Sequence, residues 1–315
     1  MMRMFVLMLL LLVVPNVVAA QETRPFQDDA GRTVVIPNRP LRIASLHDID
    51  VTIPLIELGI APIASHGRVG IDGKPYLRSS AILTGVDFSN SDMAFLGAVD
   101  IDLEALAEQK PDVIITAVGR TTPIATLEKI APTIVIDPTK FGTAHAYRKL
   151  AELTGTEDRL GILDQRYRAG IEELKTAIDT KNISVSVIQP LNGKINIYHT
   201  YRALGQVLRD AGFQFPKIIN DIPEGGRIEV SGERLPDVDA DFIFDPYRSD
   251  TGGTSKEEIE AMDKVVPDFC GFLKACAEGR YVMVSREEAI SNSYAAMALM
   301  TAVVKSAIAP RPNVR

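Results

Sequence analysis

The amino-acid sequence predicts an α/β protein with two lobes, each built on a mainly parallel sheet and bridged by a single long rigid α-helix. Strands alternate with helices on both sides of residues 156–180, and most strands are continuous apolar runs, as in parallel sheets covered on both faces. Residues 156–180 have apolar side chains at three- and four-residue steps and contain no proline. At about 1.5 Å per residue this helix would be roughly 35 Å long, about the width of a small domain.

The chain begins with a segment that has the pattern of a secretory signal peptide. Residues 1–20 carry one positive charge, then an uninterrupted apolar run, then small residues before Gln21. We therefore expect residues 1–20 to be removed on export. The rest divides into an N-terminal α/β lobe at 21–141, a helical segment at 142–181 that includes the bridging helix, and a C-terminal α/β lobe at 182–315.

Charge and cysteine content limit the class of partner. Without residues 1–20 the chain has 33 basic and 41 acidic residues, a net charge of −8, which argues against nucleic acid or an anionic membrane surface as a partner. Cys270 and Cys276 are too far apart to bridge on an unbroken helix, but Pro267 and Gly271 are able to break that helix. A disulfide between the two cysteines therefore stays open.

The first lobe follows the alternating pattern in order. A short strand at 33–37 precedes the buried strands, which we expect at 42–46, 62–65, 112–116 and 133–137. The helices between them are expected at 49–58, 103–109 and 122–130. Residues 70–95, with scattered glycine, serine, aspartate and asparagine, are predicted to be mostly loop.

The bridging helix and the second lobe follow. Thr156 is expected to cap the bridging helix, with Glu157 and Asp158 at the positive end of its dipole. The strands of the second lobe are expected at 183–188, 194–199, 241–244 and 280–284. Its helices are expected at 201–211, 256–262, 269–277 and 293–308.

A helix–strand unit occurs in both lobes with the same spacing. Glu104 and Leu106 precede Asp112 and an apolar strand, and Glu233 and Leu235 precede Asp241 and an apolar strand at the same offsets. The matching position of the two units within their lobes indicates a duplicated architecture.

No motif of a common enzyme class is present. The sequence contains no P-loop, no GxSxG nucleophile elbow, and no GxGxxG after the first strand. Its four histidines form neither HxxH nor HExxH, so we expect no metal held by protein ligands. We predict no catalytic residue and no cofactor.

The candidate site lies beyond the carboxyl ends of the strands, where ligands bind in such sheets. The side chains expected there are His47, His66, Arg68, Tyr76, Arg78, Arg120, Tyr201, Arg202, Arg227, Tyr247 and Arg248. Guanidinium groups bind carboxylates and phenolates in pairs, and tyrosines add flat contact area with a polar tip. In an acidic protein such a cleft would attract an anionic ligand, although any one of these arginines alone also fits an ordinary surface residue.

Several motifs together resemble the periplasmic iron–siderophore binding proteins of ABC importers, the helical-backbone class that also has cobalamin- and haem-binding branches. The most specific motif runs from Asp102-Leu103-Glu104 to Pro111-Asp112-Val113. The other similar segments are 29–37, 39–43, 58–63, 130–133, 208–213 and 273–281. The resemblance covers almost the whole chain after the predicted signal peptide.

This resemblance implies two Rossmann-like lobes and a non-catalytic function. A monomeric periplasmic protein would bind a ferric siderophore between the lobes and deliver it to an inner-membrane ABC permease. In relatives one glutamate of each lobe docks on permease arginines, and those positions match Glu104 and Glu233. Hydroxamate-binding members often have tryptophan in the cleft. This chain has none, so its arginines favour an anionic carboxylate- or catecholate-type complex.

Two alternatives stay open. A haem- or cobalamin-binding protein of the same fold is the first, with His47, His66 or Tyr247 as the residue that would ligate haem iron. The second is an exported chelatase-like α/β enzyme, which would need a histidine and glutamate constellation in the cleft that the spacing does not show.

Overall fold

Short β-branched and apolar segments form the sheet of the first lobe in the computed structural model, which describes residues 22–309. The strand order is β7 (Ala94–Phe95), β4 (Ala64–Ser65), β3 (Ile43–Ser45), β8 (Val113–Ala117) and β9 (Thr133–Ile136), and all neighbours are parallel. The predicted signal peptide at 1–20 lies outside the described residues.

Two antiparallel hairpins and several short helices complete the first lobe. The hairpins are β1 (Thr23–Gln27) with β2 (Thr33–Pro37), and β5 (Arg68–Val69) with β6 (Pro75–Tyr76). The helices are η1 (Asp48–Thr52), α1 (Ile53–Glu57), α2 (Ser80–Leu83), η2 (Phe88–Asn90), α3 (Leu103–Glu108), α4 (Ile124–Leu127), α5 (Pro138–Phe141) and α6 (Thr143–Thr154).

The second lobe has a mixed five-stranded sheet. Its order is β12 (Arg227–Val230), β11 (Lys194–Tyr198), β10 (Val185–Leu191), β13 (Phe242–Tyr247) and β14 (Tyr281–Ser285). β10, β13 and β14 are parallel, whereas β11 and β12 join as antiparallel strands. The helical elements are η3 (Thr180–Asn182), α8 (Arg202–Asp210), α9 (Lys217–Asn220), η4 (Gly232–Val238), α10 (Ser255–Val265), η5 (Phe269–Gly271), α11 (Lys274–Ala277), α12 (Arg286–Ala289) and α13 (Tyr294–Ile308).

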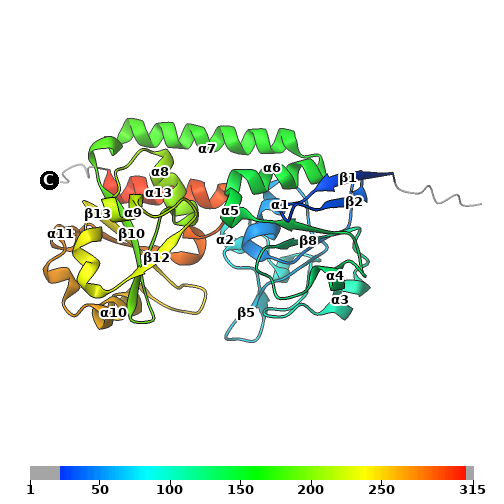
Figure 1. Ribbon diagram of the computed structural model, residues 1–315, viewed down its shortest axis with the longest axis horizontal. Helices are drawn as coiled ribbons and strands as arrows, with labels where there is room; N and C mark the ends of the chain where they lie inside the picture. Colours follow the sequence, from blue (N-terminus) through cyan, green and yellow to red (C-terminus); the bar gives the residue numbers. More distant parts are fainter. Residues whose placement is uncertain (1–21, 310–315) are drawn as a thin grey trace, which may run out of the picture.

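The predicted bridging helix is α7 (Glu157–Ala177), which runs along both lobes at the top of Figure 1. Its buried side chains include Leu163, Ile171 and Leu174, which belong to the expected apolar face. α13 lies beneath α7 in the same view and packs on α7, α8 and α1. One apolar core continues through both lobes under these helices, so the lobes share packing as well as a connection.

Some local predictions are wrong in detail. The Thr156 side chain does not cap α7; its hydroxyl lies 2.8 Å from that of Thr154 instead. The segment 70–95 is mostly loop, as predicted, but it also supplies β7, the edge strand of the first sheet. The helix expected at 122–130 is limited to α4.

The helix expected at 269–277 is broken, which settles the state of the cysteines. It consists of η5 and α11, separated by Phe272 and Leu273 in extended or irregular conformation. The break brings the Cα atoms of Cys270 and Cys276 to 5.1 Å, and the two residues form a disulfide.

Within residues 22–309 none of the helices has the length and apolar character needed to cross a bilayer.

Candidate ligand-binding site

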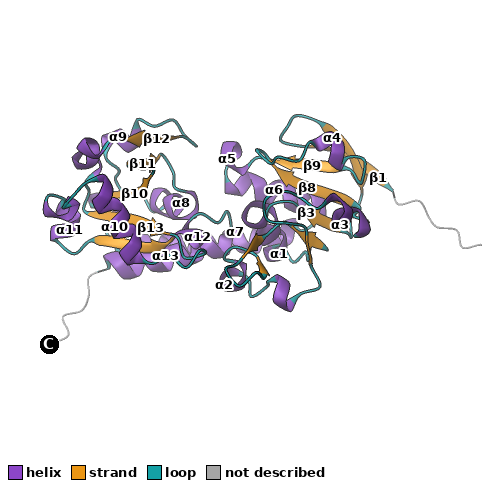
Figure 2. Ribbon diagram, turned by 90° about the horizontal axis from the view of Figure 1, so that it is seen from below, coloured by secondary structure: helices purple, strands orange, loops and turns teal. Residues whose placement is uncertain are grey.

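A cavity of about 400 Å³ lies between the two lobes. Residues 138–143, in α5 and at the start of α6, form its wall on the first lobe. Figure 2 shows α5 at the edge of the first lobe that faces β12 and α8. The opposite wall comes from the start of α8, from residues 224–227 at the start of β12, and from α12 with the loop after it.

The charged side chains of this cavity are mostly basic. Lys140, Arg202, Arg227 and Arg286 line it, against the single carboxylate of Glu224. Within the described part of the chain, Lys140 and Arg227 form no ion pair. A cavity with this charge on a chain of net charge −7 is suited to an anionic ligand.

The other two cavity arginines are held by carboxylates. Arg202 Nη1 lies 3.3 Å from Asp50 Oδ1 of the first lobe, and Arg286 Nη1 lies 2.6 Å from Glu287 Oε1. Their positive charge is therefore partly compensated inside the protein.

Aromatic side chains form flat surfaces in the same walls. Tyr198 and Tyr201 make an edge-to-face contact with ring centroids 4.8 Å apart, and Phe141 is exposed with Lys140 Nζ 4.9 Å from its ring centre. Burial raises the pKa of the Tyr201 hydroxyl, and that hydroxyl has no hydrogen-bond partner among the described residues. The cavity thus combines cations, aromatic area and one polar group without a partner.

The backbone at the start of α8 places Arg202 in the cavity. Arg202 has φ of 44°, in the left-handed region that costs free energy for a non-glycine residue. Gly205 allows the preceding loop to pack closely, because a Cβ at this position would lie 2.9 Å from the carbonyl carbon of Thr200. Such strain is common at ligand sites held by the surrounding fold.

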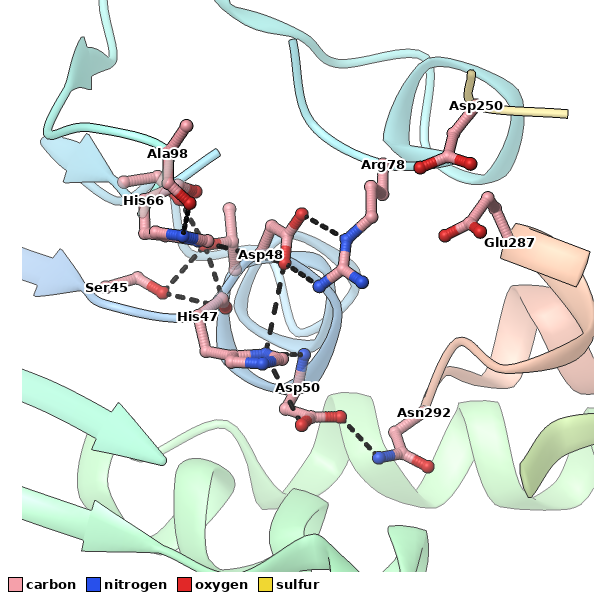
Figure 3. A network of polar contacts seen from close by, with 12 residues as sticks. Ser45, His47, Asp48, Asp50, His66, Arg78, Ala98, Asp250, Glu287 and Asn292 are labelled. Carbon is pink, nitrogen blue, oxygen red and sulfur yellow. Dashed lines mark hydrogen bonds and ion pairs between the residues drawn. The ribbon is translucent and has the colours of Figure 1, made fainter. Parts of the chain in front are cut away.

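A second polar cluster lies on the first lobe near the carboxyl ends of β3 and β4 (Figure 3). Asp48 is fully buried and accepts two hydrogen bonds from Arg78, from Nε at 2.7 Å and from Nη2 at 2.5 Å. Burial alone would raise the pKa of Asp48, but the hydrogen bonds and charge of Arg78 outweigh burial and hold this pKa well below its ordinary value. Arg78 is therefore committed to Asp48.

The two histidines of this cluster are neutral, and each makes a hydrogen bond through one ring nitrogen. His47 Nδ1 accepts the backbone N–H of Asp50 at 3.1 Å, so the neutral ring carries its proton on Nε2. His66 Nε2 lies 2.8 Å from the carbonyl oxygen of Ala98 and donates to it. Burial lowers the pKa of His47 and lowers that of His66 to about 4, so neither ring is charged at neutral pH.

Most of the remaining predicted residues lie around this cluster. Arg68 and Arg120 are half-buried and form no ion pair with the residues that the structure describes. Tyr76 donates from its hydroxyl to the carbonyl oxygen of Asp250 on the second lobe at 3.3 Å, and Arg248 pairs with the Asp250 carboxylate at 3.1 Å.

The structure therefore divides the predicted site residues into two groups. Tyr201, Arg202 and Arg227 line the inter-lobe cavity. Around the buried Asp48–Arg78 pair and the neighbouring part of the second lobe lie His47, His66, Arg68, Tyr76, Arg78, Arg120 and Arg248. Tyr247 is half-buried at the carboxyl end of β13. His66 is fully buried, so it has no surface for a ligand in this structure.

Sequence reasoning missed several residues of the cavity. Lys140 follows β9 and Arg286 follows β14, both of them strands that the sequence predicts. The rule that ligands bind beyond the carboxyl ends of parallel strands would have found both cations if it had been applied to these two strands. No local signal marks Asp50 as the partner of Arg202.

The repeated helix–strand unit has a structural explanation for two of its three shared residues. Leu106 and Leu235 are fully buried. Asp112 accepts from the backbone N–H groups of Leu41 and Arg42, which precede β3, and Asp241 accepts in the same way from Ser184 before β10. The third pair is exposed: Glu104 and Glu233 form no ion pair within residues 22–309.

Comparison with known proteins identifies the family. Residues 84–265, more than half of the chain, match the sequence model of the periplasmic binding protein family. The chain belongs to this family. It is therefore a binding protein of the periplasmic type and not an enzyme, in agreement with the sequence analysis.

Curated relatives match over shorter stretches. The iron(3+)-hydroxamate-binding protein FhuD of Bacillus subtilis (strain 168) is 33% identical over 171 residues, which cover 50% of this chain and 53% of the relative. The iron-uptake system-binding protein of the same organism is 27% identical over 170 residues, 52% of each chain. The alignments thus span about half the length of these relatives.

Solved structures confirm the two-lobed fold. SirA of Staphylococcus aureus in complex with staphyloferrin B has a TM-score of 0.74 and 20% identity, covering 91% of this chain and 98% of its own. The FhuD protein from S. pseudintermedius has a TM-score of 0.70 and 18% identity, covering 93% of this chain and 100% of its own. At these identities the likeness shows the fold.

Proposed function

We propose that the protein captures an anionic ferric siderophore in the cavity between its lobes and delivers it to an inner-membrane ABC permease for iron uptake. The observation that carries this proposal is the basic lining of the cavity, with four cationic side chains against one carboxylate. The volume of about 400 Å³ lies within the range of small-molecule sites, about 300–1,000 Å³.

The names of the similar proteins support an iron complex as the cargo. FhuD of Bacillus subtilis is an iron(3+)-hydroxamate-binding protein, one SirA structure contains staphyloferrin B, and FhuD2 of Staphylococcus aureus has been solved with ferrioxamine B. The absence of tryptophan and the four cavity cations favour a negatively charged carboxylate- or catecholate-type complex for this chain.

Haem as the ligand is disfavoured by the state of the histidines. A histidine ligates iron through an unprotonated ring nitrogen. His47 already uses the lone pair of Nδ1 to accept from Asp50, which leaves a proton on Nε2, and His66 is fully buried. Neither histidine lines the cavity, nor does Tyr247, the third candidate ligand for haem iron.

The proposal also includes the export of the protein and its docking on the permease. Residues 1–20 direct export to the periplasm and are removed, and the protein acts there as a monomer. The exposed glutamates Glu104 and Glu233, one on each lobe, dock on basic residues of the permease. The lobes extend over 21–141 and 182–315, with the helical segment 142–181 between them.

The proposal is tested by titrating intrinsic tyrosine fluorescence, since the chain lacks tryptophan and has two tyrosines in the cavity wall. The ligands are ferric citrate, a ferric tris-catecholate, ferrioxamine B, haem and cobalamin, with free N-acetyltyrosinamide as the control for light absorption. We expect saturable quenching by an anionic ferric complex, weakened by salt. Binding of haem or cobalamin alone would overturn the proposal.

The docking proposal predicts a separation of binding from transport. Glu104→Ala with Glu233→Ala should leave the affinity for the ferric complex within about twofold, because neither residue lines the cavity, and should lower iron uptake by cells about tenfold or more. Glu108→Ala with Glu260→Ala is the matched control, since both are exposed glutamates of the two lobes. Normal uptake by the first pair would reject the docking assignment.

A further inference from the structure

Asp50 is a buried carboxylate at the contact between the two lobes. It belongs to η1 of the first lobe and is 5% exposed. Its Oδ1 accepts from Asn292 Nδ2 of the second lobe at 2.5 Å, a contact that Figure 3 shows, and lies 3.3 Å from Arg202 Nη1. Its Oδ2 lies 3.3 Å from His47 Nδ1. The carboxylate thus faces one guanidinium, one amide and one neutral imidazole.

Arg202 both lines the cavity and pairs with Asp50. Its side chain is 35% exposed and lines the cavity, while Nη1 pairs with Asp50 across the lobe contact. A guanidinium has five N–H donors, but its single positive charge attracts an anionic ligand less strongly when a carboxylate already lies beside it. An anion that enters the cavity must therefore share Arg202 with Asp50 or take it from Asp50.

The other cavity cations differ in this respect. Lys140 and Arg227 form no ion pair with described residues, so their full charge faces the cavity. Arg286 pairs with its sequence neighbour Glu287 inside the second lobe. The Arg202–Asp50 pair instead joins a cavity cation to the opposite lobe.

We infer that Asp50 competes with the ligand for Arg202, and so sets the affinity of the cavity and couples its occupancy to the contact between the lobes. This inference rests on the proposed function, because it requires an anionic ligand. Coupling of this kind is reciprocal: if Asp50 weakens ligand binding through Arg202, a bound ligand weakens the Arg202–Asp50 contact by the same factor.

The inference predicts that Asp50→Asn tightens binding. Asparagine keeps an oxygen to accept from Asn292 and an amide to face His47 Nδ1, but it removes the charge that holds Arg202. We expect the affinity for ferric citrate or ferric tris-catecholate to rise about fivefold, as for the loss of a partly exposed ion pair. The readout is the same fluorescence titration.

The decisive step is a double-mutant cycle. In an Arg202→Gln background Asp50 has no guanidinium to hold, so adding Asp50→Asn should change the affinity by less than about twofold. Arg202→Gly is a second background, because glycine adopts the positive φ of this position without strain. Both backgrounds keep Lys140 and Arg227, which continue to bind the anion.

Glu224→Gln is the matched control. Glu224 lines the cavity and forms no ion pair with any residue that the structure describes, so its removal should raise the affinity by the same factor with Arg202 or without it. If Asp50→Asn raised the affinity equally in all backgrounds, the carboxylate of Asp50 would act by general repulsion of the anion. That result would overturn this inference but not the proposed function. Absence of binding of every ferric complex to the unmodified protein would overturn the proposed function itself.

Discussion

Replacing Lys140 and Arg227 together by glutamine is expected to weaken binding of an anionic ferric complex about a hundredfold. The two cations lie on opposite lobes at the same cavity and have no carboxylate partner in the described part of the chain. A hydrogen bond to a charged group contributes about 1.5 kcal/mol or more, and each 1.4 kcal/mol is a factor of ten in affinity. The loss should therefore exceed that of Arg202→Gln, which also releases Asp50.

Two exposed cations outside the cavity provide the control for this experiment. Lys217 and Arg234 pair with Asp221 and Asp237 on the surface of the second lobe. Lys217→Gln with Arg234→Gln changes the net charge equally, so it should alter the affinity by less than about twofold at moderate salt. If both double variants weakened binding equally, only the overall charge of the protein would attract the ligand. The assignment of the cavity as the binding site would then be rejected.

The fold was predictable from the sequence where short segments decide it. Apolar runs such as 112–116 and 133–137 became the parallel strands β8 and β9, and the helical periodicity of 156–180 became α7. The errors fall where one side-chain contact decides. Thr156 has the right residue type for a cap, but its hydroxyl contacts Thr154. The disulfide was left open by the sequence, because it depends on the break in the helix at Phe272.

The candidate site was only partly predictable, because it depends on which loops face each other across the lobes. Tyr201, Arg202 and Arg227 were among the side chains expected at one cleft, and they line one cavity. It did not distinguish them from Arg78, whose guanidinium is committed to Asp48 by a bidentate contact 30 residues away. The Arg202–Asp50 contact joins residues 152 positions apart, and no local pattern encodes such a pairing.

A similar buried carboxylate fastens the first lobe to the last helix. Glu57, at the end of α1, accepts from the backbone N–H groups of Tyr294 at 3.0 Å and Ala295 at 2.8 Å, the first residues of α13. It also accepts a short hydrogen bond from the Tyr147 hydroxyl. Burial raises the pKa of Glu57, and the three hydrogen bonds, which lower this pKa, offset the cost of burying the charge only in part.

Glu57→Ala should therefore lower the free energy of unfolding by about 3 kcal/mol. The substitution removes the carboxylate acceptor of three donors, two of them backbone N–H groups at the start of a helix. Only the Tyr294 N–H keeps a second contact, at 3.4 Å to the Tyr147 hydroxyl. Each such loss costs about 1–3 kcal/mol. The value is below the sum of three such losses because the cost of burying the carboxylate disappears with it. Denaturant unfolding followed by circular dichroism measures the change.

Glu57→Gln and Glu104→Ala are the control variants, which test whether the loss of stability comes from the hydrogen bonds of Glu57. The amide keeps one oxygen acceptor, so Glu57→Gln should lose about half as much stability, whereas Glu104 is exposed and its removal should change stability by less than about 0.5 kcal/mol. If Glu57→Ala unfolds at the same denaturant concentration as the unmodified protein, the contact between α1 and α13 does not hold the lobes together. The shared apolar core and α7 would then be sufficient to fix the width of the cavity.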